Sequence, residues 1–347
     1  MVMAIGTAII GAGYWGTNLI RIFHDTDGFS LNTVCDARSE ALHAIQTRYP
    51  TLHYTSSIDS VLADPAIDAV VLATPPTSHF HFARTALLAN KHVWVEKPLA
   101  LRFAEGKELV ALAATTRRTL FVDETFLYDP LIQQTRAMLV AETIGKVVHV
   151  SLERTGMGQI RRDSNVWWNS APHDLSLLRY LFNAPILRIA ASGHAFIQPR
   201  IADVAHASLE LAGGCSAHLY LNWLFPEKKA SLMIIGERGM LGYEGRFSQR
   251  ALTHYTYRLG TVATPEALYS NRIPIERSEA VARFSGDERE PLALACTAFR
   301  DSILTGKAAP SSAAYSLVTL TVLEAGARSL AQHGVWVNID PMEMDKG

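Results

Sequence analysis

The sequence predicts an α/β protein built of two domains, and three observations carry that prediction. The chain has 347 residues, which suggests two domains at roughly 150 residues each. Up to about residue 124, short apolar runs alternate with amphipathic segments, the pattern of a parallel sheet covered by helices. Beyond residue 125, strand-like segments with a period of two dominate. We therefore expect an N-terminal domain over residues 1–124 and an α+β domain over residues 125–347.

Composition and charge exclude several classes of protein. Hydrophobic residues make up 48% of the chain, which is enough to fill sizeable cores, so a disordered chain is excluded. The formal net charge is −1 and the basic residues are scattered, so we expect neither nucleic acid nor a membrane as a partner. The apolar N-terminus lacks a basic region, and it resembles a first strand rather than a signal peptide.

The three cysteines bear on the cellular compartment. Cys35, Cys215 and Cys296 are odd in number and far apart in the chain. This pattern predicts reduced thiols in a cytoplasmic protein rather than a disulfide framework, and we expect no metal site.

A glycine motif follows the first expected strand, Thr7–Ile10, and opens an expected helix. The motif is Gly11-Ala12-Gly13-Tyr14-Trp15-Gly16. The spacing G-x-G-x-x-G between strand and helix is typical of dinucleotide binding. Gly11 permits the tight turn, Gly13 lets a pyrophosphate approach the backbone, and Gly16 lets the helix pack closely on the strand. The helix N-terminus then offers free amides to the phosphates.

An acidic residue selects among nicotinamide cofactors. Asp36 follows the second expected strand, Leu31–Cys35, and lies 20 residues after Gly16. A carboxylate at this point accepts hydrogen bonds from the adenosine ribose and repels a 2′-phosphate, so we expect NAD rather than NADP. Arg38 leaves an alternative open, because it could reach a 2′-phosphate or lie in solvent at the start of the next helix.

The remaining elements of the first domain alternate in the same way. A strand over Asp68–Ala73 ends in the segment Thr74–His79, at the sheet edge where ligands bind. Two prolines predict that this segment is a rigid loop outside helix geometry. Helices are expected over Ser39–Tyr49, Ser57–Ala63, His79–Ala89 and Phe103–Thr115, and a strand over Leu120–Val122.

The apolar run Val93–Val95 ends abruptly in Glu96, Lys97 and Pro98. Charges at the carboxyl end of a buried parallel strand lie at the mouth of a doubly wound sheet, where ligands bind. A lysine there can be partly desolvated and coupled to Glu96, so that it can hold or move a proton. Taken alone, the two charges could be a surface pair before a loop; beside the other motifs they predict a catalytic Lys97.

Gly11 to Gly16, Thr74-Pro75 with His79, and Glu96-Lys97-Pro98 resemble, in this order and spacing, the Gfo/Idh/MocA family of nicotinamide-dependent sugar and polyol oxidoreductases. The resemblance implies a second domain with an open, mostly antiparallel sheet, whose outer face often forms oligomer contacts. We accordingly expect a homodimer or a homotetramer. The cofactor-binding residues that it implies are Gly11, Gly13, Tyr14, Trp15, Gly16, Asp36, Arg38, Thr74, Pro75, His79, Glu96 and Lys97.

The second half changes in character after Phe126. In Cys215–Trp223 apolar residues alternate with polar ones, which predicts a strand with one polar face. His206 and His218 fit best as residues of such a face. A helix is expected over Asp129–Ala141, and strands over Val147–Arg154, Leu187–Phe196, Ala205–Leu211, Ser216–Leu224 and Ala230–Ile235.

The segment Arg154–Tyr180 holds the second group of candidate residues. Pro172 is a good helix-opening residue, so we expect His173 in a first helical turn. The positive end of the helix dipole would disfavour a protonated imidazole there and keep His173 a competent base. A capping or packing histidine is the alternative. The family's pattern of an aspartate followed four residues later by a histidine maps onto Asn169 and His173, and favours catalysis.

A narrower resemblance covers the run from Arg161 through Trp168 to Ser176, which is similar to UDP-N-acetylglucosamine and UDP-N-acetylglucosaminuronate 3-dehydrogenases. It implies that Lys97, Arg161, Asn165, Trp168, Asn169 and His173 contact substrate. The chain also departs from these relatives. Asparagine replaces the usual aspartate at 169, which bears on turnover and substrate because an amide carries no charge. The other departures are Glu124, Gly156 and Ile160, which replace histidine, asparagine and phenylalanine.

We therefore expect an NAD-dependent oxidoreductase acting on the C3 hydroxyl of a nucleotide-linked hexose. His173 would take the hydroxyl proton and Lys97 would bind the reacting oxygen, or the two would exchange roles. Arg161 could bind a diphosphate or carboxylate, or form an interdomain salt bridge. The alternatives are a free inositol or hexose dehydrogenase, a deoxysugar 3-ketoreductase, and, in another class, a non-catalytic NAD-binding sensor.

Overall fold

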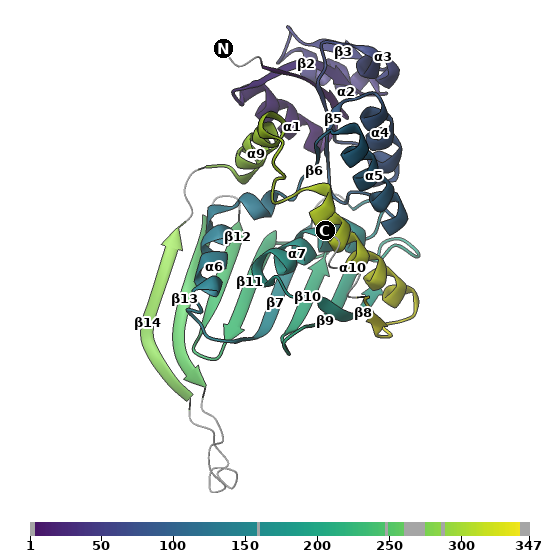
Figure 1. The fold of residues 1–347 in the computed structure, drawn as a ribbon. Helices are drawn as coiled ribbons and strands as arrows, with labels where there is room; N and C mark the ends of the chain where they lie inside the picture. The colour runs from purple at the N-terminus through teal and green to yellow at the C-terminus, as the bar shows by residue number, and fades with distance from the viewer. Residues whose placement is uncertain (1–3, 158–159, 247–248, 260–274, 286–288, 341–347) are drawn as a thin grey trace, which may run out of the picture. The chain divides into compact units, whose positions relative to one another are not determined.

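The chain folds into two compact units, each built around its own sheet (Figure 1). The structure, a computed structural model, describes residues 4–157, 160–246, 249–259, 275–285 and 289–340. The first unit comprises the residues up to Tyr128 together with Arg289–Glu324. The second comprises the described residues from Asp129 to 285 and from Ala325 to 340.

The first unit holds a six-stranded parallel sheet in the order β3-β2-β1-β4-β5-β6. This is the doubly wound order of a Rossmann fold, which confirms the expected fold class. The order reverses between β1 and β4, so the ligand crevice of such a sheet lies beyond their carboxyl ends. The strands are β1 (Ile5–Ile10), β2 (Phe29–Cys35), β3 (His53–Thr55), β4 (Ala69–Leu72), β5 (His92–Val95) and β6 (Leu120–Val122).

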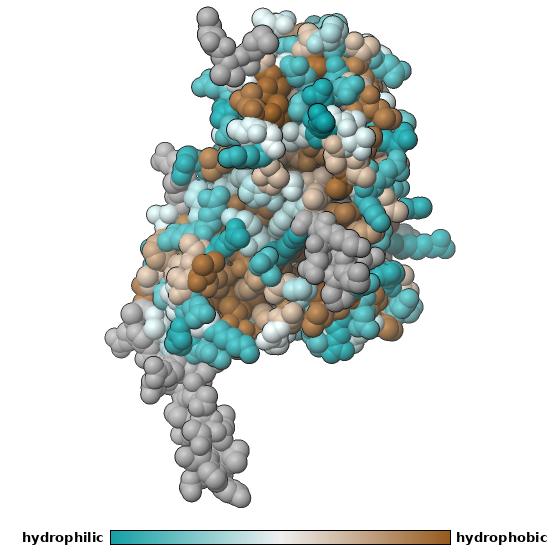
Figure 2. Space-filling view, viewed as in Figure 1, coloured by the Kyte–Doolittle hydropathy of each residue, from teal (hydrophilic) through white to brown (hydrophobic). Residues whose placement is uncertain are grey.

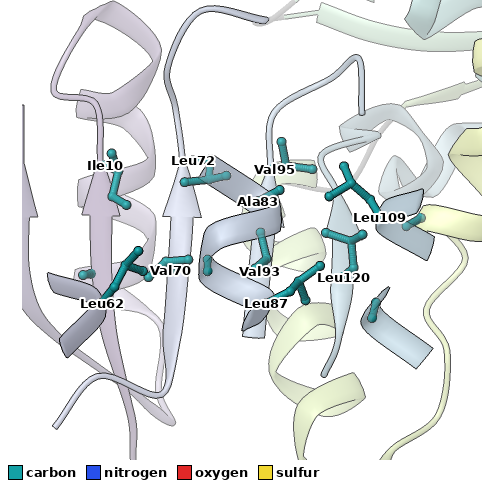
Figure 3. Close-up of a cluster of buried hydrophobic side chains, with 14 of the residues drawn as sticks. Ile10, Leu62, Val70, Leu72, Ala83, Leu87, Val93, Val95, Leu109 and Leu120 are labelled. Carbon is teal, nitrogen blue, oxygen red and sulfur yellow. The ribbon is translucent and has the colours of Figure 1, made fainter. Parts of the chain in front are cut away.

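One face of this sheet is covered by helices that follow β3, β4 and β5. Leu62, Leu87 and Leu109 come from three different helices, and all three pack with buried strand residues such as Val70 and Val93 (Figure 3). Burying each such side chain contributes roughly 1.5–3 kcal/mol. The helices of the first unit are α1 (Tyr14–Asp25), α2 (Ser39–Gln46), α3 (Ile58–Ala63), α4 (Pro76–Leu88), α5 (Phe103–Thr116), the 3₁₀ turn η1 (Thr125–Tyr128) and α9 (Pro291–Thr305), together with the beginning of α10 (Ala313–Ala331).

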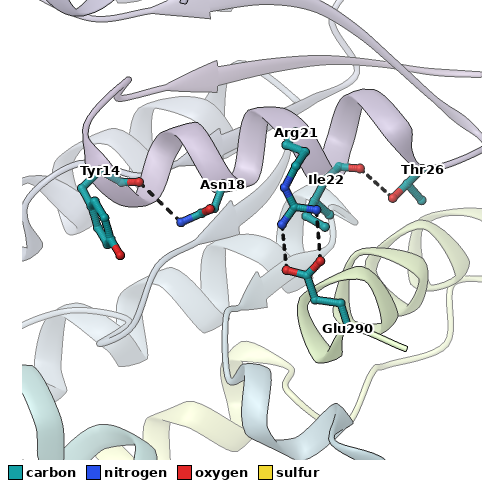
Figure 4. A network of polar contacts seen from close by, with 6 residues as sticks. All are labelled: Tyr14, Asn18, Arg21, Ile22, Thr26 and Glu290. Atoms are coloured by element: carbon teal, nitrogen blue, oxygen red, sulfur yellow. Dashed lines mark hydrogen bonds and ion pairs between the residues drawn. The ribbon is translucent and has the colours of Figure 1, made fainter. Parts of the chain in front are cut away.

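The other face carries an aromatic cluster that brings the C-terminal part of the chain back to the first unit. Phe299 of α9 is fully buried, with its ring 5.7 Å from that of Trp94 and 5.4 Å from that of Phe121. Arg21 of α1 also donates two hydrogen bonds to the Glu290 carboxylate, at 2.8 and 3.0 Å (Figure 4). The structure thus differs from the expected division at residue 124, which placed every later residue in the second domain.

Helix α4 begins three residues earlier than expected. Pro75 lies just before its first turn and Pro76 is its first residue. A proline at the first helical position costs nothing, because its missing N–H would have no partner in the helix anyway. The expectation that the prolines keep Thr74–His79 out of helix geometry was therefore wrong.

The second unit holds a nine-stranded sheet in the order β14-β13-β12-β11-β7-β10-β9-β8-β15. Its strands pair antiparallel except for β7 and β10, which are parallel. The open, mostly antiparallel sheet is thus confirmed. Its strands are β7 (Val147–Thr155), β8 (Ile186–His194), β9 (Val204–Leu211), β10 (Ser216–Asn222), β11 (Lys229–Gly236), β12 (Gly239–Arg246), β13 (Gln249–Leu259), β14 (Ile275–Ser285) and β15 (Val337–Asn338).

Helices α6 (Pro130–Val140) and α7 (Val166–Phe182) pack on one face of this sheet (Figure 1). Along β10 the apolar residues Ala217, Leu219 and Leu221 are buried, which confirms the period-two prediction. On the polar side, His206 stacks on Tyr220 with ring centroids 4.8 Å apart. His218 lies 3.0 Å from the Ser208 hydroxyl, so both histidines belong to the polar sheet face, as expected.

On the face seen in Figure 2, the described surface mixes hydrophilic and hydrophobic residues. Within the described ranges, no helix is long and apolar enough to cross a membrane. The structure also shows, among the residues it describes, no group of three or more histidine, cysteine, aspartate or glutamate side chains that could hold a metal ion. Cys35, Cys215 and Cys296 are buried free thiols.

Candidate active site

The glycine loop between β1 and α1 has the shape that a dinucleotide needs. Gly11 has φ +104°, and a Cβ there would lie 2.6 Å from the Ala73 carbonyl oxygen. At Gly16 a Cβ would lie 2.0 Å from the Gly11 carbonyl oxygen. Gly13 begins α1 without a side-chain cap, so its first-turn amides can bind an anion. The loop therefore fits the pyrophosphate of NAD.

Asp36 and Arg38 form a pair beside this loop. Asp36 is buried, and its Oδ2 accepts a hydrogen bond from the Ala12 amide at 2.8 Å. The exposed Arg38 guanidinium donates to both Asp36 oxygens at 3.0 Å. Burial acts to raise the pKa of the Asp36 carboxyl, but the hydrogen bonds from Arg38 and Ala12 outweigh it and hold this pKa below its ordinary value. Arg38 thus lies largely in solvent at the start of α2, as one of the two alternatives expected, and its guanidinium is paired with Asp36.

We predict that NAD(H) binds at least about tenfold tighter than NADP(H), a difference of roughly 1.4 kcal/mol. To bind a 2′-phosphate, Arg38 would have to break its ion pair with Asp36, which would leave the buried Asp36 carboxylate without a positively charged partner. Calorimetric titration with both cofactors measures the ratio. Asp36→Ala should narrow it, whereas the matched variant Arg38→Ala should leave it or widen it. Equal affinities in the wild type would contradict the prediction.

The segment after β4 is contacted by the buried histidine His79. His79 is fully buried, with Nε2 2.9 Å from the Thr74 carbonyl oxygen and Nδ1 2.8 Å from that of Pro98. It therefore links the loop after β4 to the loop after β5. Thr74 also accepts a hydrogen bond from the Ser78 hydroxyl at 2.8 Å, while Pro75 is exposed. His79 thus supports the expected cofactor segment through the backbone.

Lys97 follows β5 and lies next to two carboxyl groups. The indole Nε1 of Trp15, in the first turn of α1, donates to Glu96 at 2.6 Å. Burial and the nearby Asp123 carboxyl raise the pKa of Glu96 well above its ordinary value, while the charge of Lys97 acts in the opposite direction. The expected coupling between Lys97 and Glu96 is present. The sequence prediction missed Asp123, although its place directly after the buried strand β6 could have indicated it.

In the second unit, α7 begins at Val166 and not at Pro172, so the predicted helix start was wrong. The Asn165 side chain caps the helix by accepting a hydrogen bond from the Trp168 amide at 3.1 Å. Asparagine is among the strongest capping residues, and it marks the helix start while Pro172 lies inside the helix. His173 therefore lies beyond the first turn, where the dipole effect has fallen off. Asn165, expected at the substrate, uses its amide oxygen on the helix.

Asn169 and His173 are four residues apart on α7, so both lie on one face of the helix, and both are partly exposed. The next residue, Asp174, is buried and accepts hydrogen bonds from Arg154 of β7 at 2.7 and 3.1 Å. This ion pair anchors α7 to the sheet beside His173. The sequence prediction did not assign Arg154 this function.

Arg161 pairs locally. Its guanidinium donates two hydrogen bonds of 2.9 Å to Asp163 in the same loop, and these hold the pKa of Asp163 below its ordinary value. The sequence left two expectations for this arginine, and one was an interdomain salt bridge. The ion pair in the structure is instead with Asp163 of the same loop. Both members of the pair are about one-third exposed, and Trp168 is also partly exposed.

Comparisons with known proteins agree with both units. Residues 5–124 match the GFO_IDH_MocA model, described as an oxidoreductase family with an NAD-binding Rossmann fold. Residues 132–242 match the GFO/IDH/MocA C-terminal domain.

Three similar proteins illustrate the extent of the likeness. The uncharacterized oxidoreductase YrbE of Bacillus subtilis is 25% identical over 59% of this chain and 61% of its own length. This chain thus spans about three fifths of that relative. D-apiose dehydrogenase of Paraburkholderia graminis is 24% identical over 95% of this chain and 79% of its own. The structure of UDP-N-acetylglucosamine 3-dehydrogenase GnnA of Acidithiobacillus ferrooxidans shares the fold, with a TM-score of 0.79 at 21% identity, over 95% of this chain and 99% of that one.

Proposed function

This chain belongs to the GFO/IDH/MocA family of oxidoreductases, and we propose that it transfers a hydride between the C3 carbon of a nucleotide-linked N-acetylhexose and NAD. The observation that carries the proposal is the position of Lys97. Lys97 follows the buried parallel strand β5 and lies beside the carboxyl groups of Glu96 and Asp123. Trp15, which follows the glycine loop, donates a hydrogen bond to Glu96. A charged amine in such a position can act on a reacting hydroxyl.

In the proposed reaction, the nicotinamide of bound NAD supplies the hydride acceptor. His173 takes the proton of the C3 hydroxyl as the hydride leaves the same carbon. Lys97 donates a hydrogen bond to the reacting oxygen and stabilises the negative charge that develops there. In the alternative assignment the two residues exchange these roles.

The sugar-nucleotide class is supported by the sequence of the segment Arg161–Ser176. Arg161 is our candidate for binding a diphosphate or a carboxylate, because its planar guanidinium suits both groups and is paired with Asp163, whose side chain is about one-third exposed. Trp168 and Asn169 are the further candidates for substrate contact. We also expect the polar sheet face that contains His206 and His218 to form the interface of a homodimer or homotetramer.

The test is turnover of the purified protein with NAD and a set of alcohols. We expect reduction of NAD with UDP-N-acetylglucosamine or with UDP-N-acetylglucosaminuronate. We expect no comparable turnover with free myo-inositol or free hexoses. Turnover with the free polyols alone would favour the inositol-type alternative. NAD binding without turnover of any sugar or sugar nucleotide would favour the sensor.

Asn169→Asp gives a prediction about the same site. A carboxylate one helical turn before His173 should raise the pKa of the imidazole, so the pH dependence of kcat should move upward. If the wild type is slow, the variant should also be faster. Turnover is measured against pH with substrate titrated at each pH. The matched control is Asn165→Asp, which adds the same charge one turn earlier and preserves the helix cap. An unchanged profile with weaker substrate binding would instead mean that the Asn169 amide contacts the substrate.

A further inference from the structure

Two carboxyl groups meet at the carboxyl edge of the first sheet. Glu96 follows β5 and Asp123 follows β6, and these strands pair in parallel so that Val95 is opposite Val122. The side chain of Asp123 is almost fully buried. Its Oδ1 accepts a hydrogen bond from the Thr125 hydroxyl at 2.5 Å. The two carboxyl groups therefore lie side by side at this edge, and each acts on the pKa of the other through a hydrogen-bonding contact.

This contact requires a proton. Among the described residues, no donor reaches the buried Oδ2 of Asp123 with hydrogen-bond geometry. Ionised carboxylates are acceptors only, so two of them cannot hydrogen-bond unless one is protonated. A buried acceptor with no donor costs roughly 1–3 kcal/mol, and a second buried charge costs more. A proton held between Glu96 and Asp123 satisfies both oxygens.

The charges around the pair favour one proton rather than none or two. Burial is the main cause that raises the pKa of both carboxyls, and repulsion from Asp123 raises that of Glu96 further. The positive charge of Lys97 acts on both and favours one negative charge. The Cys296 thiol on α9 also faces Asp123, but burial raises its pKa to about 12, so it remains neutral.

We propose that Glu96 and Asp123 share a single proton, and that Asp123 is thereby a positioning residue for Lys97 and Trp15. The pair then presents one negative charge to the one positive charge of Lys97. Its Glu96 oxygen also holds the indole of Trp15, and so ties the first turn of α1 to the end of β5. Loss of the shared proton would place two negative charges in contact and force the carboxyls apart.

Infrared spectroscopy tests the shared proton without reference to activity. Wild-type protein at neutral pH should show the carbonyl stretch of a buried protonated carboxyl, sensitive to exchange into D₂O. Asp123→Asn and Glu96→Gln should each remove this band, because the remaining carboxyl ionises with an amide as its partner. The matched control Thr125→Ala removes a hydrogen bond but no carboxyl, and should retain the band. Absence of the band from the wild type, or its persistence in both carboxyl variants, would overturn the proposal.

A second measurement, which rests on the proposed function, is the pH profile of kcat. In the wild type, activity should fall at alkaline pH when the pair loses its proton. Asp123→Asn carries a single negative charge throughout, so its alkaline limb should move up by about one pH unit or more. An alkaline limb at the same pH in both proteins would contradict the positioning role. Failure of the proposed function would abolish this measurement for both proteins but leave the infrared result standing.

Discussion

Replacing Lys97 with alanine is expected to lower kcat by about 10²-fold or more while NAD still binds, since removing one oxyanion-stabilising donor or one general base has about this effect. Cofactor affinity should survive, because the phosphate-binding amides belong to the glycine loop and not to Lys97. Steady-state kinetics with the sugar nucleotide and calorimetric titration with NAD measure the two quantities separately.

Lys97→Arg distinguishes the two possible functions of the amine. An arginine keeps the positive charge and donates hydrogen bonds, but it does not lose its proton in a protein. Partial activity in this variant would support charge stabilisation by Lys97, whereas a loss equal to that of alanine would favour its alternative role as the base. If Lys97→Ala keeps kcat within a few-fold of the wild type, Lys97 is not catalytic.

The parts of the site that could be predicted from the sequence depend on neighbours in the chain. Gly16 has no room for a Cβ because the Gly11 carbonyl lies five residues earlier in the chain, and Gly11 itself adopts a positive φ, so the motif carries the prediction although Ala73, which follows the distant strand β4, also crowds Gly11. Glu96 and Lys97 stand out because charges interrupt a buried strand. Asp123 also follows a buried strand directly, but its closeness to Glu96 follows from the pairing of β5 with β6, which no local pattern reports.

The errors follow from long-range packing and from competing local signals. That α9 belongs to the first unit depends on the contact of Phe299 with Trp94, and no local pattern reports such a contact. Strands β12, β13 and β14 were not predicted, since polar residues interrupt their alternation. At α7 two helix-start signals competed, and the helix begins at the Asn165 cap with Pro172 inside it, although an internal proline removes one hydrogen bond and crowds the carbonyl four residues earlier.

Because α7 begins at Val166, the helix dipole no longer gives a reason to expect a catalytic His173. The ion pair between Arg154 and Asp174 gives a different reason. Asp174 is held by Arg154, with the two side chains 3% and 16% exposed, so the helix turn that carries His173 is fixed to β7. A catalytic base needs a fixed position more than it needs a helix dipole. The partly exposed imidazole can therefore act from a rigid element of the second unit.

Replacing His173 with alanine should accordingly lower kcat by about 10²-fold or more, with NAD affinity and melting temperature close to those of the wild type. The ring is partly exposed, although its Nδ1 is buried, so truncating it should cost less stability than breaking the ion pair beside it. Asp174→Asn is the informative comparison, because it leaves Arg154 buried without its ion pair and should cost about 3 kcal/mol or more of stability. Thermal denaturation and kinetics of both variants separate the two effects: a large loss of kcat without a shift in melting temperature assigns chemistry to His173. Near-wild-type turnover in His173→Ala would remove it from the reaction and leave the proton to Lys97.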